Sequence, residues 1–102
     1  MDAEGLTDVQ RMISEVCDEV KELLIRKNIA YGNSAIEPLR IFSKASPIEQ
    51  INVRLDDKLS RIAKGDVNFE DEDVEKDVMG YLVLKRVAKR VQARSVPAPV
   101  IN

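Results

Sequence analysis

The sequence contains no histidine, no tryptophan and only one cysteine. Without histidine, a Ser-His-Asp triad, a Cys-His pair and a histidine-ligated zinc site are all excluded. The single cysteine, Cys17, excludes an internal disulfide and is typical of a reducing cytoplasm, where we expect the protein to act. Any catalytic groups must therefore be carboxylates, lysines, arginines or tyrosines, and carboxylates favour a hard cation such as Mg²⁺.

The chain also has few aromatic residues, no long apolar run and no excess of basic charge. Only Tyr31, Tyr81, Phe42 and Phe69 are available to stack on a base, and no apolar run approaches the ~20 residues of a membrane span. The first residues are acidic and lack the features of a signal peptide. The formal net charge is -2, whereas nucleic-acid-binding proteins are usually basic. We therefore expect neither a membrane nor a nucleic acid among the partners.

What the sequence does contain is a globular mixture of 44% hydrophobic and 33% charged residues over 102 residues. This composition and length suit one small domain. We place the domain at residues 1–94 and a flexible tail at residues 95–102, which includes two prolines. Because a domain of this size buries a modest fraction of its surface, we also expect a homo-oligomer. The predicted fold class is all-α, a small bundle of three main helices completed by oligomerisation.

Apolar residues at spacings of three and four predict the three amphipathic helices. The first begins after Thr7, which forms a capping box with Gln10, and ends near Asn28, before a turn-rich segment. Its apolar stripe comprises Val9, Met12, Ile13, Val16, Val20, Leu23 and Leu24.

The second helix has clear signals at both ends. Ser46 and Glu49 form a second capping box, Pro47 occupies the first helical position, and Gly65 is the expected C-terminal cap. The buried stripe is predicted to be Ile48, Ile51, Leu55, Leu59 and Ile62.

The segment before the second helix and the third helix have less regular patterns. At residues 35–45 we predict a short helical turn in which Leu39, Ile41 and Phe42 pack over the core. The third helix begins among the acidic residues at 70–73, which suit the positive end of its dipole. Its apolar band is wide enough to be covered on two sides, one of them by a second subunit. The band comprises Val74, Val78, Tyr81, Leu82, Val87, Ala88 and Val91.

Each helix carries one cluster of charged residues that is a candidate for chemistry. The clusters are Glu15, Glu19 and Glu22; Arg54, Asp57, Lys58 and Arg61; and Asp73 and Asp77. Carboxylates one turn apart are able to bind a divalent cation, and lysine and arginine suit phosphate. The alternative is a set of solvated helix faces, with Asp57 and Arg61 as an ordinary ion pair and Asp73 favouring the helix start. Asp77 fits this alternative least, because it adjoins an apolar band and a buried carboxylate needs a partner.

Three segments of the chain together resemble a family of phage proteins, the nucleotide modification associated domain 1 family. Residues 26–34, RKNIAYGNS, are similar to that family's K-N-x-D-Y-G-x-S segment. Residues 54–61, RLDDKLSR, resemble its R-x-x-D-K-x-x-R helix, and residues 72–81, EDVEKDVMGY, resemble its E-D-x-x-x-D-L-x-G-Y helix. The three similarities occur in the same order and together extend over residues 22–84.

The phage family is similar in layout to the MazG-like all-α nucleotide pyrophosphohydrolases. Those proteins present carboxylates in E-x-x-E and E-x-x-D patterns to Mg²⁺ and a nucleoside triphosphate. Glu19 and Glu22 match the first pattern and Asp77 matches the aspartate of the second, but Val74 stands three residues before it. Ala30 also stands where the phage family tends to carry aspartate. With these departures, the resemblance supports nucleotide contact more than turnover.

The resemblance implies a role for each matched residue. Asp57 and Asp77 would be catalytic. The metal ligands would be Glu19, Glu22, Asp57, Asp73 and Asp77, and the nucleotide-binding residues would be Asn28, Tyr31, Lys58 and Arg61. The implied function is a phage-type nucleotide-binding protein in the host cytoplasm, and the reaction that the resemblance offers for it, without deciding that it is an enzyme, is Mg²⁺-dependent nucleoside triphosphate pyrophosphohydrolysis.

Two other functions remain open. An incomplete acidic motif beside intact basic and aromatic residues fits a non-catalytic protein that sequesters a nucleotide, such as a cyclic signalling nucleotide of host defence. A helical oligomerisation or partner-binding module would use the charged clusters only for solvation. In that case, Asp57 and Asp77 would tolerate alanine without loss of function.

Overall fold

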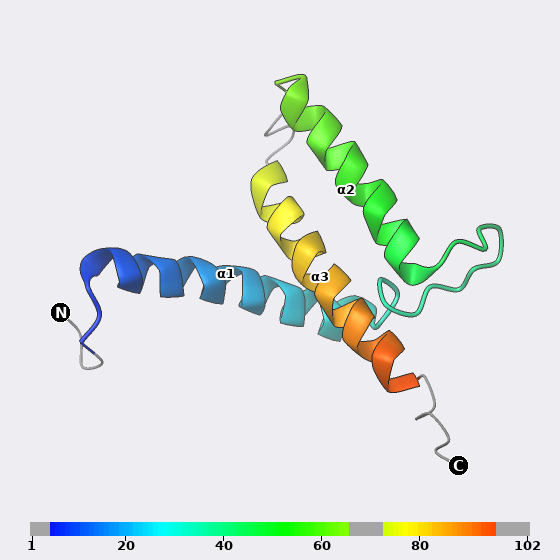
Figure 1. Ribbon diagram of the computed structural model, residues 1–102, viewed down its shortest axis with the longest axis horizontal. Coiled ribbons are helices and arrows are strands. Elements are labelled where there is room, and N and C mark those ends of the chain that lie inside the picture. Colours follow the sequence, from blue (N-terminus) through cyan, green and yellow to red (C-terminus); the bar gives the residue numbers. More distant parts are fainter. Residues whose placement is uncertain (1–4, 66–72, 96–102) are drawn as a thin grey trace, which may run out of the picture. The chain divides into compact units, whose positions relative to one another are not determined.

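The computed structural model describes residues 5–65 and 73–95, which form three α-helices and no strand (Figure 1). The all-α class is thereby confirmed for this part of the chain. Residues 70–72 and 96–102, where we predicted the acidic helix start and most of the tail, lie outside the described residues. The chain divides into two units, residues 1–32 and residues 33–102.

The first unit contains one helix, α1, which spans Asp8–Tyr31. The predicted capping box is confirmed: the Thr7 hydroxyl accepts the Gln10 backbone N–H at 3.1 Å, and the Gln10 side-chain oxygen accepts the Thr7 N–H at 3.0 Å. The helix continues past Asn28, so the predicted end was wrong. It stops at Gly32, whose φ of 73° lies in the region that favours glycine.

Much of the apolar stripe of α1 faces solvent. Val20 is buried at 6% exposure, and Leu23 and Leu24 are half-buried. The exposed members of the stripe are Val9, Met12, Ile13 and Val16. The spacing therefore predicted the apolar side of the helix correctly, but not its solvent exposure.

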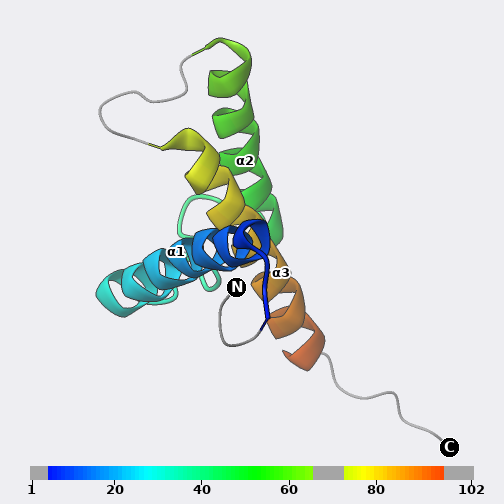
Figure 2. The same cartoon turned by 90° about the vertical axis from the view of Figure 1, so that its left-hand side faces the viewer.

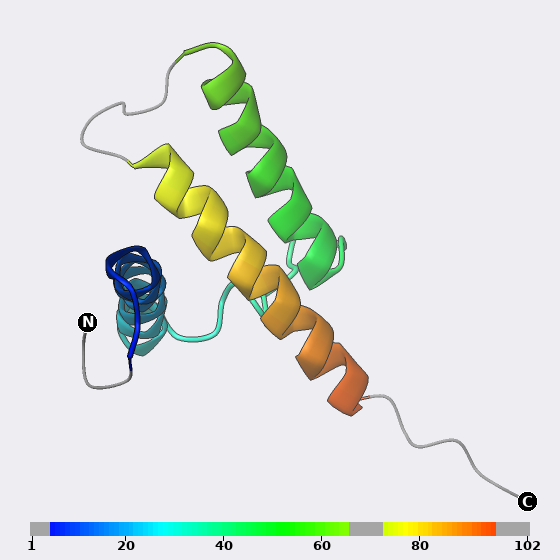
Figure 3. The same ribbon diagram turned by 60° about the vertical axis from the view of Figure 1, so that its left-hand side comes forward.

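The second unit is built on two antiparallel helices, α2 at Pro47–Ala63 and α3 at Val74–Ser95, which pack against each other (Figures 2 and 3). The centre of their core is formed by Ile51, Leu55 and Ala88, which are 2%, 7% and 4% exposed. Half-buried apolar residues from both helices and from the preceding segment surround this centre: Ile36, Ile48, Val78, Tyr81 and Leu84. The second predicted helix thus buries much of its stripe against the third.

The ends of α2 follow the predicted signals in part. The Ser46 hydroxyl accepts the Glu49 N–H at 3.1 Å, as predicted for the cap. The Glu49 carboxylate does not close the predicted box, and it accepts the Asn52 side-chain amide at 3.1 Å instead. Lys64 caps the C-terminus, and Gly65 follows it with a φ of 84°, which explains the need for glycine there.

The prediction of a helical turn at residues 35–45 is wrong. Leu39, Ile41 and Phe42 are 87%, 66% and 99% exposed, and none of the segment is α-helical. Ile36 is the residue of this segment that packs against the core. The predicted packing is wrong because connecting segments run over the surface of a protein. In an irregular segment, the spacing of apolar residues does not indicate which of them face the core.

The apolar band of α3 is buried on the side that faces α2. Val74 is fully buried and Ala88 is 4% exposed, whereas Leu82, Val83 and Val87 are 49%, 45% and 39% exposed. A second cover over this band, by another subunit, stays a prediction. Among the helices of the described residues, none combines the length and apolar character of a membrane span.

Candidate functional site

The charged clusters of α2 and α3 meet at one point between the two helices. Lys58 Nζ lies 3.3 Å from Asp77 Oδ2, and the side chains are 12% and 21% exposed. The partner that a half-buried Asp77 carboxylate needs is therefore Lys58. These two residues belong to the second and third segments of the family resemblance, so the structure brings those segments into contact.

Helical spacing explains how both side chains reach this position. Lys58 follows the buried Leu55 by three residues, so both lie on the side of α2 that faces α3. Asp77 follows the fully buried Val74 by three residues and precedes Tyr81, which packs against the core, by four. The pair thus lies at the edge of the core, where neighbouring atoms displace water and strengthen the attraction.

Asp57 and Arg61 form a second ion pair one turn apart on α2. Arg61 Nε lies 3.7 Å from Asp57 Oδ2, and the side chains are 37% and 64% exposed. This is the ordinary i,i+4 pair that the sequence allowed, and such pairs contribute about 0.3–0.5 kcal/mol. Arg61 therefore lies one turn from Lys58 with a half-buried side chain, whereas Asp57 is a surface residue.

Asp73 caps the N-terminus of α3. Its carboxylate accepts the Lys76 backbone N–H at 3.0 Å, and its carbonyl oxygen accepts the Asp77 N–H at 3.0 Å. A carboxylate in this position satisfies an otherwise unpaired N–H and interacts favourably with the helix dipole. The structural role that the sequence offered for Asp73 is confirmed.

The predicted metal site of Glu19, Glu22, Asp57, Asp73 and Asp77 stays a prediction, because its members belong to two separate units of the chain. Within residues 5–65 and 73–95, no three histidine, cysteine or acidic side chains are grouped so that they could hold a metal ion. Mg²⁺ requires oxygen ligands in nearly ideal octahedral geometry, but Asp77 and Asp73 are engaged by Lys58 and by a backbone N–H. Glu19 and Glu22 belong to the other unit, on α1, and are exposed.

The two predicted nucleotide contacts of the first unit lie near the end of α1. The Asn28 carbonyl oxygen accepts the Gly32 N–H at 2.7 Å, and the Asn28 amide donates to the Gly32 carbonyl oxygen at 3.4 Å. Asn28 therefore helps to terminate the helix. Tyr31 is 77% exposed, so its ring is accessible for stacking.

No family model, curated protein or solved structure matches this chain. The resemblance to phage nucleotide-associated proteins therefore stays a prediction that rests on the three sequence segments. The structure adds one independent relation to them, the ion pair between Lys58 and Asp77.

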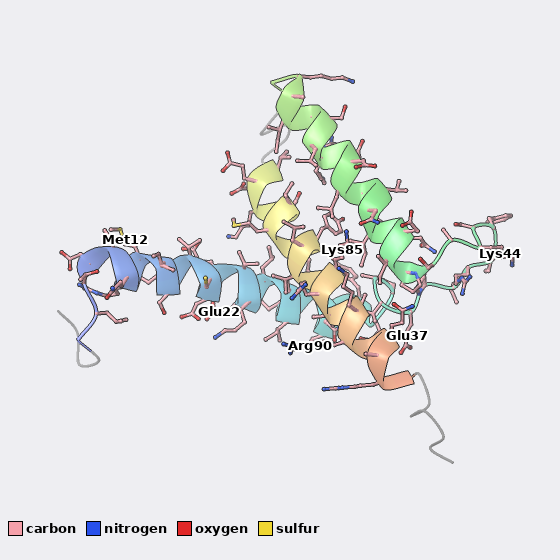
Figure 4. The ribbon with its side chains drawn as sticks, in the orientation of Figure 1. Met12, Glu22, Glu37, Lys44, Lys85 and Arg90 are labelled. Carbon is pink, nitrogen blue, oxygen red and sulfur yellow. The ribbon has the colours of Figure 1, made fainter. Side chains whose placement is uncertain are left out.

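The loop before α2 exposes an aromatic residue between two cations, and of these three residues the sequence had pointed only to Phe42, as a residue available to stack on a base. Phe42 is almost fully exposed, and Arg40 and Lys44 on either side of it each donate to the other's carbonyl oxygen, at 2.5 and 3.1 Å. Arg40 has a φ of 59°, which is unusual for a residue other than glycine. Figure 4 shows Lys44 at the loop. The available signal was local charge, because residues 38–48 include two cations and no acid in an otherwise acidic chain.

Proposed function

We propose that this chain is a phage-type nucleotide-binding protein whose phosphate-binding residues are Lys58 and Arg61 of α2. The observation that supports the proposal most is the 3.3 Å contact between Lys58 and Asp77. It joins the charged residues of two separate segments that resemble nucleotide-associated phage proteins. A purely solvated helix face has no need for a lysine that is only 12% exposed and paired across to another helix.

The chemistry of these side chains suits phosphate. Lys58 has three N–H donors, so it can bind Asp77 and a phosphate oxygen at the same time. Arg61, one turn away and 37% exposed, has a planar guanidinium that donates two parallel hydrogen bonds to phosphate. Asp77 orients the ammonium group and thereby reduces the side-chain entropy that Lys58 would lose on binding.

Binding without hydrolysis has more support than pyrophosphohydrolysis. Asp77 is paired with Lys58, Asp73 caps α3, and Val74 stands at the acidic position of the family pattern. A Mg²⁺-dependent reaction would first require Asp77 to exchange its ammonium partner for the cation. We therefore propose nucleotide sequestration as the activity, and Mg²⁺-dependent hydrolysis is the alternative that the resemblance implies.

Calorimetry with a panel of linear and cyclic nucleotides, with and without Mg²⁺, tests the proposal directly. The Arg61→Ala change should weaken binding by about tenfold or more, because a charge-assisted hydrogen bond to phosphate is lost. Lys64→Ala is the matched control, since Lys64 is an exposed cation at the end of the same helix. Its affinity for the same nucleotide should equal that of the wild type.

The same samples separate binding from turnover. Metal-independent binding without product supports sequestration. Mg²⁺-dependent release of pyrophosphate, lost in Asp77→Asn, would replace it with the hydrolase alternative. If no nucleotide in the panel produces heat or a thermal shift, both nucleotide functions are wrong, and a helical oligomerisation or partner-binding module becomes the better account.

A further inference from the structure

The C-terminal half of α3 concentrates positive charge in a chain whose net charge is negative. Five cations and no acid lie between residues 78 and 95: Lys85, Arg86, Lys89, Arg90 and Arg94. The net charge of -2, which argues against a nucleic-acid partner, therefore describes the chain as a whole and not this half of the helix. The excess of positive charge is a property of the sequence and does not depend on where α1 lies.

The helix itself needs only one of these five cations. A cation at a helix C-terminus interacts favourably with the helix dipole, and this effect is confined to the last turn. Arg94 is the basic residue of the last turn of α3, and the other four precede it. Within the described part of the second unit, none of the five side chains forms a hydrogen bond or an ion pair. The described residues of this unit therefore give four of the five cations no partner.

Helical spacing arranges the five cations in two rows along α3. Lys85 and Lys89, one turn apart, form the first row, and the three arginines, also one turn apart, form the second. Arg86 and Arg90 are each two positions from Ala88, which packs in the core with α2. Since residues two positions apart lie on nearly opposite sides of a helix, the arginine row faces away from α2. The last turns of α3 also extend beyond the first turn of α2 (Figures 1 and 3).

The two rows of cations suit the two phosphate backbones of a DNA duplex. An α-helix is about 10–12 Å across and fits the major groove of B-DNA, which is about 12 Å wide. A phosphate backbone borders the groove on each side, so each row of cations would face one backbone. Arginine also donates two parallel hydrogen bonds to a phosphate group. A flat anionic surface, such as a membrane, would contact only one of the rows.

We propose that the C-terminal half of α3 binds the phosphate backbones of double-stranded DNA in the major groove. These five residues bind without preference for sequence, because phosphate contacts carry no information on the bases. DNA binding goes beyond the proposed nucleotide binding and is independent of it, since none of the five cations belongs to the site at Lys58 and Arg61.

Fluorescence anisotropy of a labelled DNA duplex, titrated with the full chain at several salt concentrations, tests the proposal. Each neutralised phosphate contributes about −0.9 to the slope of log K against log salt, so the wild type should give a slope of about −4 to −5. Lys89→Gln and Arg90→Gln should each weaken binding by about tenfold and make the slope shallower by about one.

Lys64→Gln is the matched control, because it removes the same charge from an exposed lysine at the C-terminus of α2, beside the other end of α3. This control should bind the duplex like the wild type. Circular dichroism should show equal helix content in all four proteins. Duplex binding that is unchanged in Lys89→Gln and Arg90→Gln, or equally weakened in Lys64→Gln, overturns the proposal.

Three other anions show whether the duplex is the partner: a single-stranded oligonucleotide, poly-glutamate and vesicles that contain phosphatidylserine. Weaker binding to all three than to the duplex supports the proposal. Binding to any of them that is as tight as binding to the duplex overturns it, and poly-glutamate would then indicate an acidic protein and the vesicles a membrane. Absence of duplex binding at about 50 mM salt also overturns it. If Arg90→Gln lowers the melting temperature in that case, acidic residues of the chain itself pair with these cations.

Discussion

The α2–α3 pair and α1 are built from similar apolar repeats, yet they differ in how much of the repeat is buried. Ile51 of α2 is 2% exposed, whereas Ile13 of α1 is 59% exposed. In the second unit, α3 supplies side chains that fill the spaces between those of α2. The comparison shows that periodicity determines which side of a helix is apolar, while burial depends on a partner surface that periodicity does not specify.

The largest expected effect on stability comes from replacing an isoleucine by alanine in the core of the second unit, and the same replacement on α1 is the comparison. Ile51→Ala should lower the free energy of unfolding by about 2–5 kcal/mol, because it removes apolar contacts and leaves a cavity in the core. Ile25→Ala, at 54% exposure on α1, should change it by less than about 0.5 kcal/mol. Urea denaturation of both variants checks the difference. Equal effects would show that burial does not separate the two regions as described.

The same difference between the two regions is seen in their ion pairs, of which one is largely buried and the other is exposed. Lys58 and Asp77 are 3.3 Å apart and 12% and 21% exposed, whereas Lys21 and Asp18 on α1 are 3.0 Å apart and 62% and 53% exposed. The shorter distance belongs to the pair that should matter less, because water screens exposed charges and competes for their hydrogen bonds. Burial is therefore a better guide than distance to the contribution of these pairs.

Single and double substitutions test this expectation. Asp77→Ala should lower the free energy of unfolding by about 1–3 kcal/mol, because it leaves the Lys58 ammonium half-buried without its carboxylate. The double variant Lys58→Met and Asp77→Leu should recover much of that loss, since no unpaired charge remains. Asp18→Ala should leave the denaturation midpoint unchanged within error. An Asp77→Ala midpoint equal to that of the wild type would show that the pair is only a surface contact.

Local signals in the sequence predicted much of the secondary structure. The caps at Thr7 and Ser46 and the glycine after α2 are short-range features, because each depends on residues within one helical turn. The end of α1 was predicted too early, because only a residue with positive φ, Gly32, terminates the helix. Phe42 was assigned to the core because its apolar character suggested burial, but an irregular loop gives no periodicity from which to predict it.

The candidate site was predictable as a set of residues but not as an arrangement. The spacing of apolar residues predicted that Lys58 and Asp77 lie on two different helices. It did not predict which residues of the two helices lie side by side. The need of Asp77 for a partner was visible in the sequence, and the packing of α2 on α3 supplies that partner. Asp73 illustrates the opposite case, because its capping bond is local and the sequence offered that role directly. Convergence of carboxylates depends on tertiary packing and was therefore the least predictable feature.

The smallest expected effect concerns the exposed pair on α1 and its dependence on pH. The pKa of Lys21 is raised above its ordinary value of 10.5, first by the hydrogen bond that it donates to Asp18 and then by the charges of Asp18 and Glu22. Because the pKa is higher in the folded than in the unfolded chain, the pair stabilises the fold fully below about pH 10.5. That stabilisation is lost as the pH rises through the pKa of the folded state.

Asp18→Asn should therefore lower the pKa of Lys21, and Glu22→Gln should lower it less, because Glu22 acts only through its charge. An NMR titration that follows the Lys21 side chain from pH 9 to 12 would measure both shifts. If Glu22→Gln produces the larger shift in the pKa of Lys21, the hydrogen bond to Asp18 is not the main cause of the raised pKa. The charge of Glu22 would then contribute more than the 3.0 Å contact between Lys21 and Asp18.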